Sequence, residues 1–233
     1  MISVCMATYN GKKYIRQQLE SILLQLSESD EVIVSDDSST DNTLEIIESF
    51  KDKRIKIFRG NSFKNPIFNF EFALKQAKGD FIFLSDQDDF WLENKVEVTM
   101  KYLKYYDMIV SDCYVTDELL QIQQNSFFEL KNSKPGFFYN FYRNTYSGNC
   151  MAFRKSVLNK ALPFPKSIPM HDIWLGAVCD LLFKVKFIEE KLIYFRRHGE
   201  NSSSSSEKSK YNFFNKLMFR VNIILAIPKI ILR

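Results

Sequence analysis

Residues Phe81-Ile82-Phe83-Leu84-Ser85-Asp86-Gln87-Asp88-Asp89-Phe90-Trp91 join an apolar run to a dense group of carboxylates. The apolar run has no polar side chain on either face, which is typical of a strand buried on both sides. The three carboxylates repel one another and lose hydration beside such a strand unless a cation lies among them. Divalent cations that carry phosphate oxygens prefer these ligands. A solvated acidic turn is the simpler interpretation of an isolated Asp-x-Asp. The rest of the chain must therefore decide between a solvated turn and a cation-binding site.

The first half of the chain alternates strand-like and helix-like patterns. Short apolar runs predict strands over residues 2–6, 32–34, 55–58 and 81–84. Apolar residues at helical spacing predict helices over residues 14–26, 40–50 and 68–78. This alternation predicts βαβ units, and therefore an α/β fold with a mostly parallel sheet flanked by helices.

Polar clusters follow three of these predicted strands. They occupy residues 8–10 (TYN), 36–39 (DDSS) and 86–89 (DQDD). Ligands of parallel sheets bind beyond the carboxyl ends of the strands. The repetition of such clusters after successive strands therefore predicts one ligand site at this edge of the sheet.

The second half, from about Met108, is less regular. Its patterns predict a strand over residues 150–153, helices over 156–162 and 173–183, and a hairpin of strands 184–188 and 192–195. We expect residues 127–142 to be partly loop. The serine run at 201–206 is the clearest linker.

Composition restricts the class of protein. The 233 residues suffice for one large α/β domain. The cysteines are scattered, which favours a reducing compartment over a disulfide framework or a zinc site. The chain opens on a strand with no charged leader before it, so we expect a cytoplasmic protein. The first 207 residues hold 26 of the 32 basic residues and all 28 acidic ones. This slightly acidic body argues against a nucleic-acid binder.

The C-terminal stretch has a pattern of its own, with six basic residues and no acidic one from Lys208 onward. The apolar residues that share one helical face are Phe214, Leu217, Met218, Val221, Ile224 and Leu225. Pro228 interrupts the stretch, which is too short for a bilayer span of about 20 apolar residues. We expect a basic amphipathic helix lying in an anionic membrane surface. The alternatives are packing on the domain or binding of a partner protein.

Three motifs together resemble family 2 glycosyltransferases. They are residues 3–11 (SVCMATYNG), 34–41 (VSDDSSTD) and 79–91 (GDFIFLSDQDDFW), in the order and spacing of that family over about residues 1–200. The third motif is similar to that of bacterial enzymes that build surface polysaccharide such as capsule or O-antigen, including rhamnosyl-, glucosyl- and galactosyltransferases. The resemblance implies an inverting enzyme with the A-type glycosyltransferase fold.

The resemblance also implies which residues contact a UDP- or dTDP-sugar. They are Ala7, Thr8, Tyr9, Asp36, Asp37, Asp86 and Gln87. Tyr9 would lie near the base, one of Asp36 and Asp37 would bond the uracil or thymine ring, and Asp86 would contact the ribose or sugar. Ser38 stands where the family commonly has Gly, which changes the expected loop conformation.

The metal site and the diphosphate contacts are assigned in the same way. Asp88 would hold the Mg²⁺ or Mn²⁺ that bridges the diphosphate, and His198 would complete the metal shell, since imidazole is a common ligand of Mn-like ions. A surface histidine in a basic turn is the alternative for His198. Arg197, or its neighbour Arg196, would contact the diphosphate. Gly148 would allow the backbone to approach a sugar closely.

Asp172, in residues 170–174 (MHDIW), occupies the place of the family's catalytic acidic residue. The reaction needs a base, because a sugar hydroxyl loses its proton as it attacks the anomeric carbon. The start of an apolar helix lowers the pKa of a carboxyl, so partial burial would have to keep Asp172 basic enough. The alternative is a plain helix N-cap.

The sequence therefore predicts a metal-dependent inverting glycosyltransferase on the inner face of the plasma membrane, with a saccharide acceptor that is lipid-linked. The catalytic domain spans 1–200, with a donor half at 1–107 and an acceptor half at 108–200. A linker at 201–210 and the tail at 211–233 follow. One alternative is a nucleotidyltransferase, for which residues 8–13 (TYNGKK) hold too few glycines. Another is an inactive nucleotide-sugar-binding protein, against which the intact Asp86, Asp88 and Asp172 argue.

Overall fold

The computed structural model describes residues 1–199 and 213–232. Its strands are β1 (Ile2–Thr8), β2 (Glu31–Asp36), β3 (Ile55–Phe58), β4 (Phe81–Ser85), β5 (Phe90–Trp91), β6 (Met108–Thr116), β7 (Ile122–Gln124), β8 (Met151–Arg154) and β9 (Val185–Arg196). Its α-helices are α1 (Ile15–Leu23), α2 (Thr43–Ser49), α3 (Pro66–Gln76), α4 (Lys95–Tyr102), α5 (Phe127–Lys131), α6 (Phe137–Arg143), α7 (Ser156–Ala161), α8 (His171–Leu182) and α9 (Phe213–Leu232). A 3₁₀ turn, η1 (Gly148–Cys150), precedes β8.

All of these strands belong to one sheet in the order β3-β2-β1-β4-β8-β6-β9-β5, with β7 paired to β6. The first four strands are parallel, and their register aligns Thr8 with Asp36 and Met6 with Ser85. The carboxyl ends of β1, β2 and β4 therefore lie side by side. The predicted α/β fold is confirmed, although β5, β7 and β8 run antiparallel to their neighbours.

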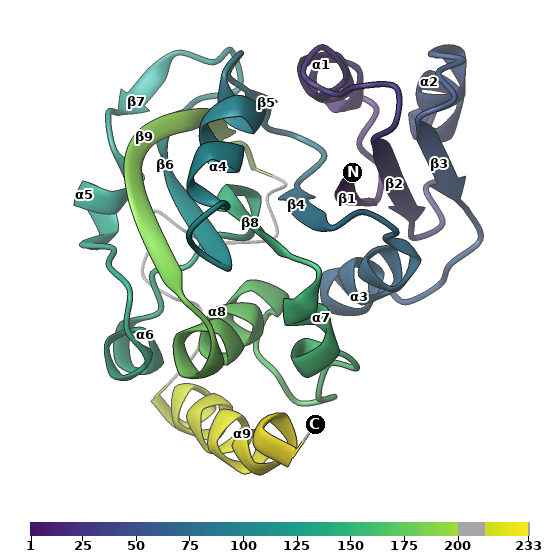
Figure 1. Ribbon diagram of the computed structural model, residues 1–233. Helices are drawn as coiled ribbons and strands as arrows, with labels where there is room; N and C mark the ends of the chain where they lie inside the picture. The colour runs from purple at the N-terminus through teal and green to yellow at the C-terminus, as the bar shows by residue number, and fades with distance from the viewer. Residues whose placement is uncertain (200–212, 233) are drawn as a thin grey trace.

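Helices cover both faces of the parallel strands, with α1 and α2 on one side and α3 on the other (Figure 1). Apolar residues of β1, β2 and β4, such as Val4, Ile33 and Phe83, are fully buried between these layers. Gly79 enters β4 so close to β1 that a Cβ would lie 2.7 Å from the backbone nitrogen of Ser3. A side chain there would force the two strands apart, so this glycine fixes how β4 joins the sheet.

The predicted hairpin over residues 184–195 is wrong, because β9 is one strand from Val185 to Arg196. Glu189 and Glu190, which lie between the two predicted strands, are exposed residues within β9. The pairing of β9 with β6 shifts between Ser111 and Asp112, so a bulge accommodates the two glutamates instead of a chain reversal. The long partner strand β6, which the sequence analysis missed, lies in the centre of the second half of the sheet.

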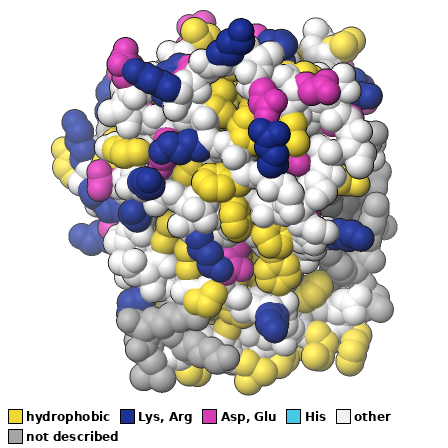
Figure 2. Space-filling view, turned by 90° about the vertical axis from the view of Figure 1, so that its right-hand side faces the viewer, with side chains coloured by type: hydrophobic (Ala, Val, Ile, Leu, Met, Phe, Trp, Pro, Cys, Tyr) yellow, Lys and Arg dark blue, Asp and Glu magenta, His cyan; other side chains and the backbone are white. Residues whose placement is uncertain are grey.

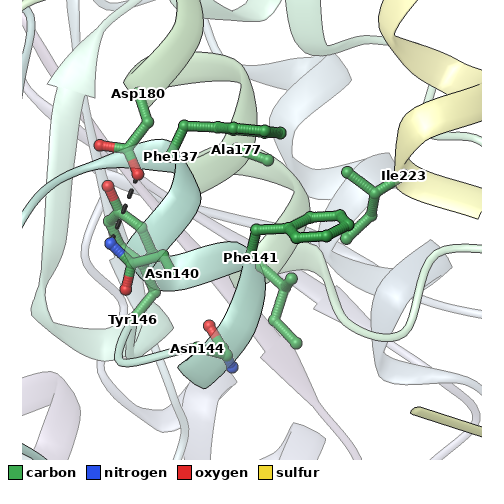
Figure 3. Close-up of a pocket in the computed structure, with 9 residues that line it drawn as sticks. Phe137, Asn140, Phe141, Asn144, Tyr146, Ala177, Asp180 and Ile223 are labelled. Carbon is green, nitrogen blue, oxygen red and sulfur yellow. Dashed lines mark hydrogen bonds between the residues drawn. The ribbon is translucent and has the colours of Figure 1, made fainter. Parts of the chain in front are cut away.

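Helix α9 packs against the domain below α8 and α7 (Figure 1). Its Ile223 side chain is buried and faces Phe141 of α6 across a small cavity (Figure 3). The Arg220 guanidinium donates to the backbone oxygens of Phe141 and Tyr142, at 3.2 and 2.7 Å. These two bonds turn the Arg220 side chain toward the domain.

The apolar face predicted for the tail is the face that α9 exposes. Leu225 is 67% exposed and Phe214 is 66% exposed, whereas Ile223 and Ala226 on the packed face are 4% exposed. Hydrophobic side chains lie along the lower edge of the face in Figure 2, at the height of α9 in Figure 1. Within the described residues, no helix has the length and apolar character needed to cross a bilayer. The predicted linker at 201–210 lies outside the described residues.

Candidate functional site

A cavity of about 780 Å³ opens beyond the carboxyl ends of β1, β2 and β4. It is also bordered by η1 and by the first turn of α8. The residues predicted for the site that line this cavity are Ala7, Thr8, Tyr9, Asp37, Asp86, Gln87, Asp88, Gly148 and Asp172. Parallel pairing of the strands brings the first seven of these together, as the repeated polar clusters predicted.

The loops after β1 and β4 hold each other through one side chain. The amide of Gln87 accepts from the backbone N–H of Tyr9 at 2.9 Å and donates to the Tyr9 backbone oxygen at 3.0 Å. The Tyr9 ring remains 56% exposed at the cavity. Gln87 therefore positions the Tyr9 backbone and leaves its ring available to stack on a planar ligand.

Asp36 and Asp37 have different surroundings. Asp36 is fully buried, does not line the cavity, and accepts from the hydroxyls of Thr8 and Ser39 at 3.0 and 2.6 Å. Asp37 lines the cavity and accepts from the backbone N–H of Phe63 at 2.6 Å. Asp37 is therefore the member of the pair that faces the cavity, and Asp36 fixes the turn behind it.

The Asp86–Asp89 turn concentrates negative charge beside the buried end of β4. Loss of hydration, followed by the charges of Asp88 and Asp172, raises the pKa of Asp86 to about 8. Burial, followed by the charges of Asp88 and Asp86, raises the pKa of Asp89 well above its ordinary value. Such mutual repulsion is relieved when a cation binds among the carboxylates, so the turn fits a cation-binding site.

Asp89 is buried behind this turn and orients it. Its carboxylate accepts from the Asn149 side-chain amide at 2.6 Å and from the backbone N–H of Arg196 at 3.0 Å. The Arg196 guanidinium donates to the backbone oxygens of Asp88 and Glu118, at 2.8 and 2.6 Å. These bonds fix the backbone of the turn independently of the Asp88 side chain.

His198 reaches the site from the end of β9, where its Nε2 lies 2.8 Å from Oδ2 of Asp88. Both side chains are mostly buried, at 7% exposure for His198 and 14% for Asp88. The imidazole and the carboxylate thus converge as the sequence analysis expected of two metal ligands. Arg197 does not line the cavity; its guanidinium lies 5.5 Å from the centre of the Phe195 ring.

Asp172 lies in the first turn of α8, and Met170 is the N-cap of that helix. The N–H of Ile173 donates to the Asp172 carboxylate at 2.7 Å, and the N–H of Gly148 also donates to it. Burial raises the pKa of Asp172 to about 6, and these backbone bonds lower it only in part. Burial therefore outweighs the helix N-terminus, and the carboxylate can accept a proton near neutral pH.

Part of the cavity wall was not predicted from the sequence. One group comes from the loop after β3 and from α3, and it consists of Ser62, Lys64, Asn65, Pro66, Asn69 and Phe70. A second group, at the start of α8, consists of Met170 and His171. The loop after β3 ends at Asn65, whose side chain accepts from the N–H of Ile67 and caps α3, with Pro66 in the first turn. The position of this loop at the carboxyl end of a parallel strand was the available signal.

Comparison with known proteins agrees with these motifs. Residues 3–162 match the profile of glycosyl transferase family 2. The chain is 38% identical to the Escherichia coli UDP-Glc:alpha-D-GlcNAc-diphosphoundecaprenol beta-1,3-glucosyltransferase WfaP over 104 residues, which are 45% of this chain and 41% of WfaP. It is 29% identical to the Shigella flexneri dTDP-rhamnosyl transferase RfbG over 231 residues, covering 88% of this chain and 76% of RfbG. The chain thus spans less than half of the length of WfaP.

A solved structure shares the fold. Residues 1–349 of S. aureus TarS, in complex with UDP-GlcNAc, superpose with a TM-score of 0.74 at 24% identity, covering 96% of this chain and 66% of that one. The family match covers more than half of the chain, and its motifs are the strand ends that line the cavity. This chain therefore belongs to glycosyl transferase family 2.

Proposed function

We propose that this chain transfers a sugar, with inversion, from a UDP- or dTDP-sugar to a saccharide acceptor in the biosynthesis of bacterial surface polysaccharide. The observation that carries the proposal is the position of Asp172, whose carboxylate shares one cavity with the acidic turn after β4. The nucleotide would lie against Ala7, Thr8, Tyr9 and Asp37. We assign residues 1–107 chiefly to the donor and residues 108–200 to the acceptor.

The donor atoms of the site fit a hard divalent cation such as Mg²⁺ or Mn²⁺. Among the residues that the structure describes, no group of three or more His, Cys, Asp or Glu side chains is arranged to hold an ion. Asp88 and His198 would therefore be the protein ligands, and diphosphate oxygens and water would supply the rest, as is common at substrate-phosphate sites. When bound, the cation would neutralise charge on the leaving diphosphate.

Asp172 would act as the general base. The acceptor oxygen attacks the anomeric carbon of the donor while its proton moves to the Asp172 carboxylate. The bond between the anomeric carbon and the phosphate oxygen breaks, and its electron pair leaves with the nucleoside diphosphate. Because the backbone N–H groups of Gly148 and Ile173 orient the carboxylate, it needs no rearrangement to accept this proton.

We further propose that the acceptor is lipid-linked and that the protein lies on the inner face of the plasma membrane. The name of WfaP gives an acceptor on a diphosphoundecaprenol carrier, which supports the class of acceptor. The exposed apolar face of α9 supports the membrane surface, since burying apolar area contributes about 25 cal/mol per Å². Basic residues near an anionic leaflet each add about 1 kcal/mol.

A donor screen tests the proposed function. The protein is heated with UDP- and dTDP-sugars in the presence of Mn²⁺, and release of nucleoside diphosphate is then measured with a lipid-linked saccharide. The correct donor, at about 100 times its dissociation constant, stabilises the fold by about 2.7 kcal/mol. If no nucleotide sugar stabilises the protein or is turned over, the proposed function is wrong.

A further inference from the structure

His171 is a buried histidine at the wall of the large cavity, immediately before Asp172 in the first turn of α8. Its ring stacks on Phe70 of α3, with ring centroids 4.1 Å apart and an interplanar angle of 25°. On another side, its Nε2 would lie 2.8 Å from a Cβ added to Gly148. The ring is therefore held between an aromatic face and a bare backbone, and its orientation is fixed by packing.

Neither ring nitrogen of His171 has a hydrogen-bond partner within the described part of the chain. The other buried side-chain atoms in that condition there belong to Trp91, Ser111, Asn144 and Tyr146. None of those four residues lines the large cavity, whereas His171 does. A buried polar group left without a partner destabilises a fold, so its presence at the wall of a cavity calls for an explanation.

Burial lowers the pKa of His171 to about 3, so its imidazole is neutral near pH 7. A neutral imidazole presents one N–H donor and one acceptor nitrogen. A hydroxyl group can satisfy either of them, because it both donates and accepts, whereas a phosphate oxygen can only accept. The site therefore matches the hydroxyl groups of a sugar better than it matches the diphosphate.

We propose that His171 binds a sugar hydroxyl next to Asp172 and thereby determines which sugar the site accepts. The inference rests on the proposed function and adds to it a residue for recognition of the sugar. The hydroxyl belongs to the donor sugar or to the acceptor saccharide, and the chemistry at the imidazole is the same for both. Discrimination at such a position is strong, because a sugar without the hydroxyl leaves the imidazole unpaired.

The test compares His171→Phe with His171→Gln. Phe retains an aromatic ring to stack on Phe70 but cannot form the hydrogen bond, whereas the amide of Gln can both donate and accept. We expect His171→Phe to unfold at the same or a higher temperature than the wild type, because a buried unpaired group has been removed. We expect its kcat/KM to fall about 10- to 100-fold, and His171→Gln to keep kcat/KM within about threefold of the wild type.

Two binding measurements identify the sugar. If the hydroxyl is on the donor, His171→Phe weakens binding of the nucleotide sugar but not of the free nucleoside diphosphate. If it is on the acceptor, both affinities are unchanged and kcat/KM falls only when the acceptor is varied. Ser111→Ala is the matched control, because it also removes a buried unpartnered polar atom but lies outside the cavity, and we expect wild-type kinetics.

The proposal is overturned if His171→Phe turns over and binds like the wild type, or if His171→Gln is as impaired as His171→Phe. Should His171→Phe fail to fold, His171→Leu with His171→Gln gives the same comparison. These outcomes are distinct from failure of the proposed function, which would appear as absent turnover in the wild-type protein itself.

Discussion

Nε2 of His198 lies 2.8 Å from Oδ2 of Asp88, although the two residues are 110 positions apart in the chain. Strand β9 makes this contact possible, because it pairs in parallel with β6 and ends at Arg196 beside the acidic turn. The backbone N–H of Arg196 bonds Asp89, which aligns the chain just before His198. The segment after β9, which holds His198, is therefore held against the acidic turn that follows β4.

Replacing Asp88 by Ala should abolish turnover and metal-dependent nucleotide binding but leave the fold intact. The fold is retained because Arg196 holds the backbone oxygen of residue 88, and because one charge fewer relieves repulsion in the turn. Calorimetry with nucleotide sugar in the presence of Mn²⁺ or EDTA measures the effect. Normal turnover of the variant in EDTA would exclude the metal assignment.

Asp89→Ala, unlike Asp88→Ala, should destabilise the fold. It removes the acceptor for the Asn149 amide and for the backbone N–H of Arg196, both of which are buried. Leaving these donors unpaired should lower the free energy of unfolding by about 1–3 kcal/mol each. Denaturant unfolding of the two variants therefore separates the residue that binds a ligand from the residue that supports the turn.

Asp172→Asn should keep donor affinity close to that of the wild type and lower kcat by about 10²–10⁴, the usual scale of general-base catalysis. Asn is nearly isosteric with Asp but cannot accept the proton. Calorimetry for donor binding and steady-state kinetics for turnover measure the two effects separately. A proportionate loss of donor binding would indicate a binding role in place of a catalytic one.

The pKa of Asp172 predicts opposite pH trends for activity and stability. Activity requires the carboxylate, so kcat/KM should rise with pH and level off above about pH 6. The folded-state pKa lies above the ordinary value, so the protonated form stabilises the fold, and this contribution is lost as pH rises through about 6.

Asp172→Asn lacks this titration and provides the comparison. Its free energy of unfolding should exceed that of the wild type at pH 7–8. The difference should shrink below about pH 4, where Asp172 of the wild type is protonated in both the folded and the unfolded protein. Unfolding curves across this pH range test the expectation. A difference that does not depend on pH would mean that Asp172 is not buried as described.

The exposed face of α9 predicts that membrane binding can be removed without loss of enzymatic activity. Leu217→Glu combined with Leu225→Glu should release the protein from anionic vesicles, because both side chains are exposed on the apolar face. Turnover of a water-soluble acceptor analogue should be unchanged. Leu119→Glu, an exposed apolar residue beside β7, is the matched control and should bind vesicles normally.

Vesicle sedimentation across a salt series measures this binding, which should weaken with salt without vanishing, since only its electrostatic part is screened. Deletion of residues 211–233 is a less direct test, because it also exposes the surface that Ile223 and Ala226 cover. If the double variant sediments as well as the wild type, α9 does not bind the membrane.

The sequence by itself determined the first half of the fold, where the local hydrophobic pattern and the packing against neighbouring elements favour the same structure. Strands β1 to β4 are short apolar runs separated by amphipathic helices, so local periodicity predicted that they run parallel, with polar clusters at their ends. The roles of Asp86, Asp88 and Asp172 were predicted through the family resemblance of their motifs, and they stay predictions. Even the apolar face of the tail was evident from helical spacing.

Only the tertiary structure decided how the distant segments meet. The bulge at Glu189 and Glu190 keeps β9 in one strand, a choice that depends on its partner β6 and not on its own residues. Asp36 and Asp37 are chemically identical, yet only Asp37 faces the cavity. His171 became a candidate only once Phe70 and Gly148 were seen to enclose its ring, because burial and hydrogen-bond partners are properties of contacts across the chain.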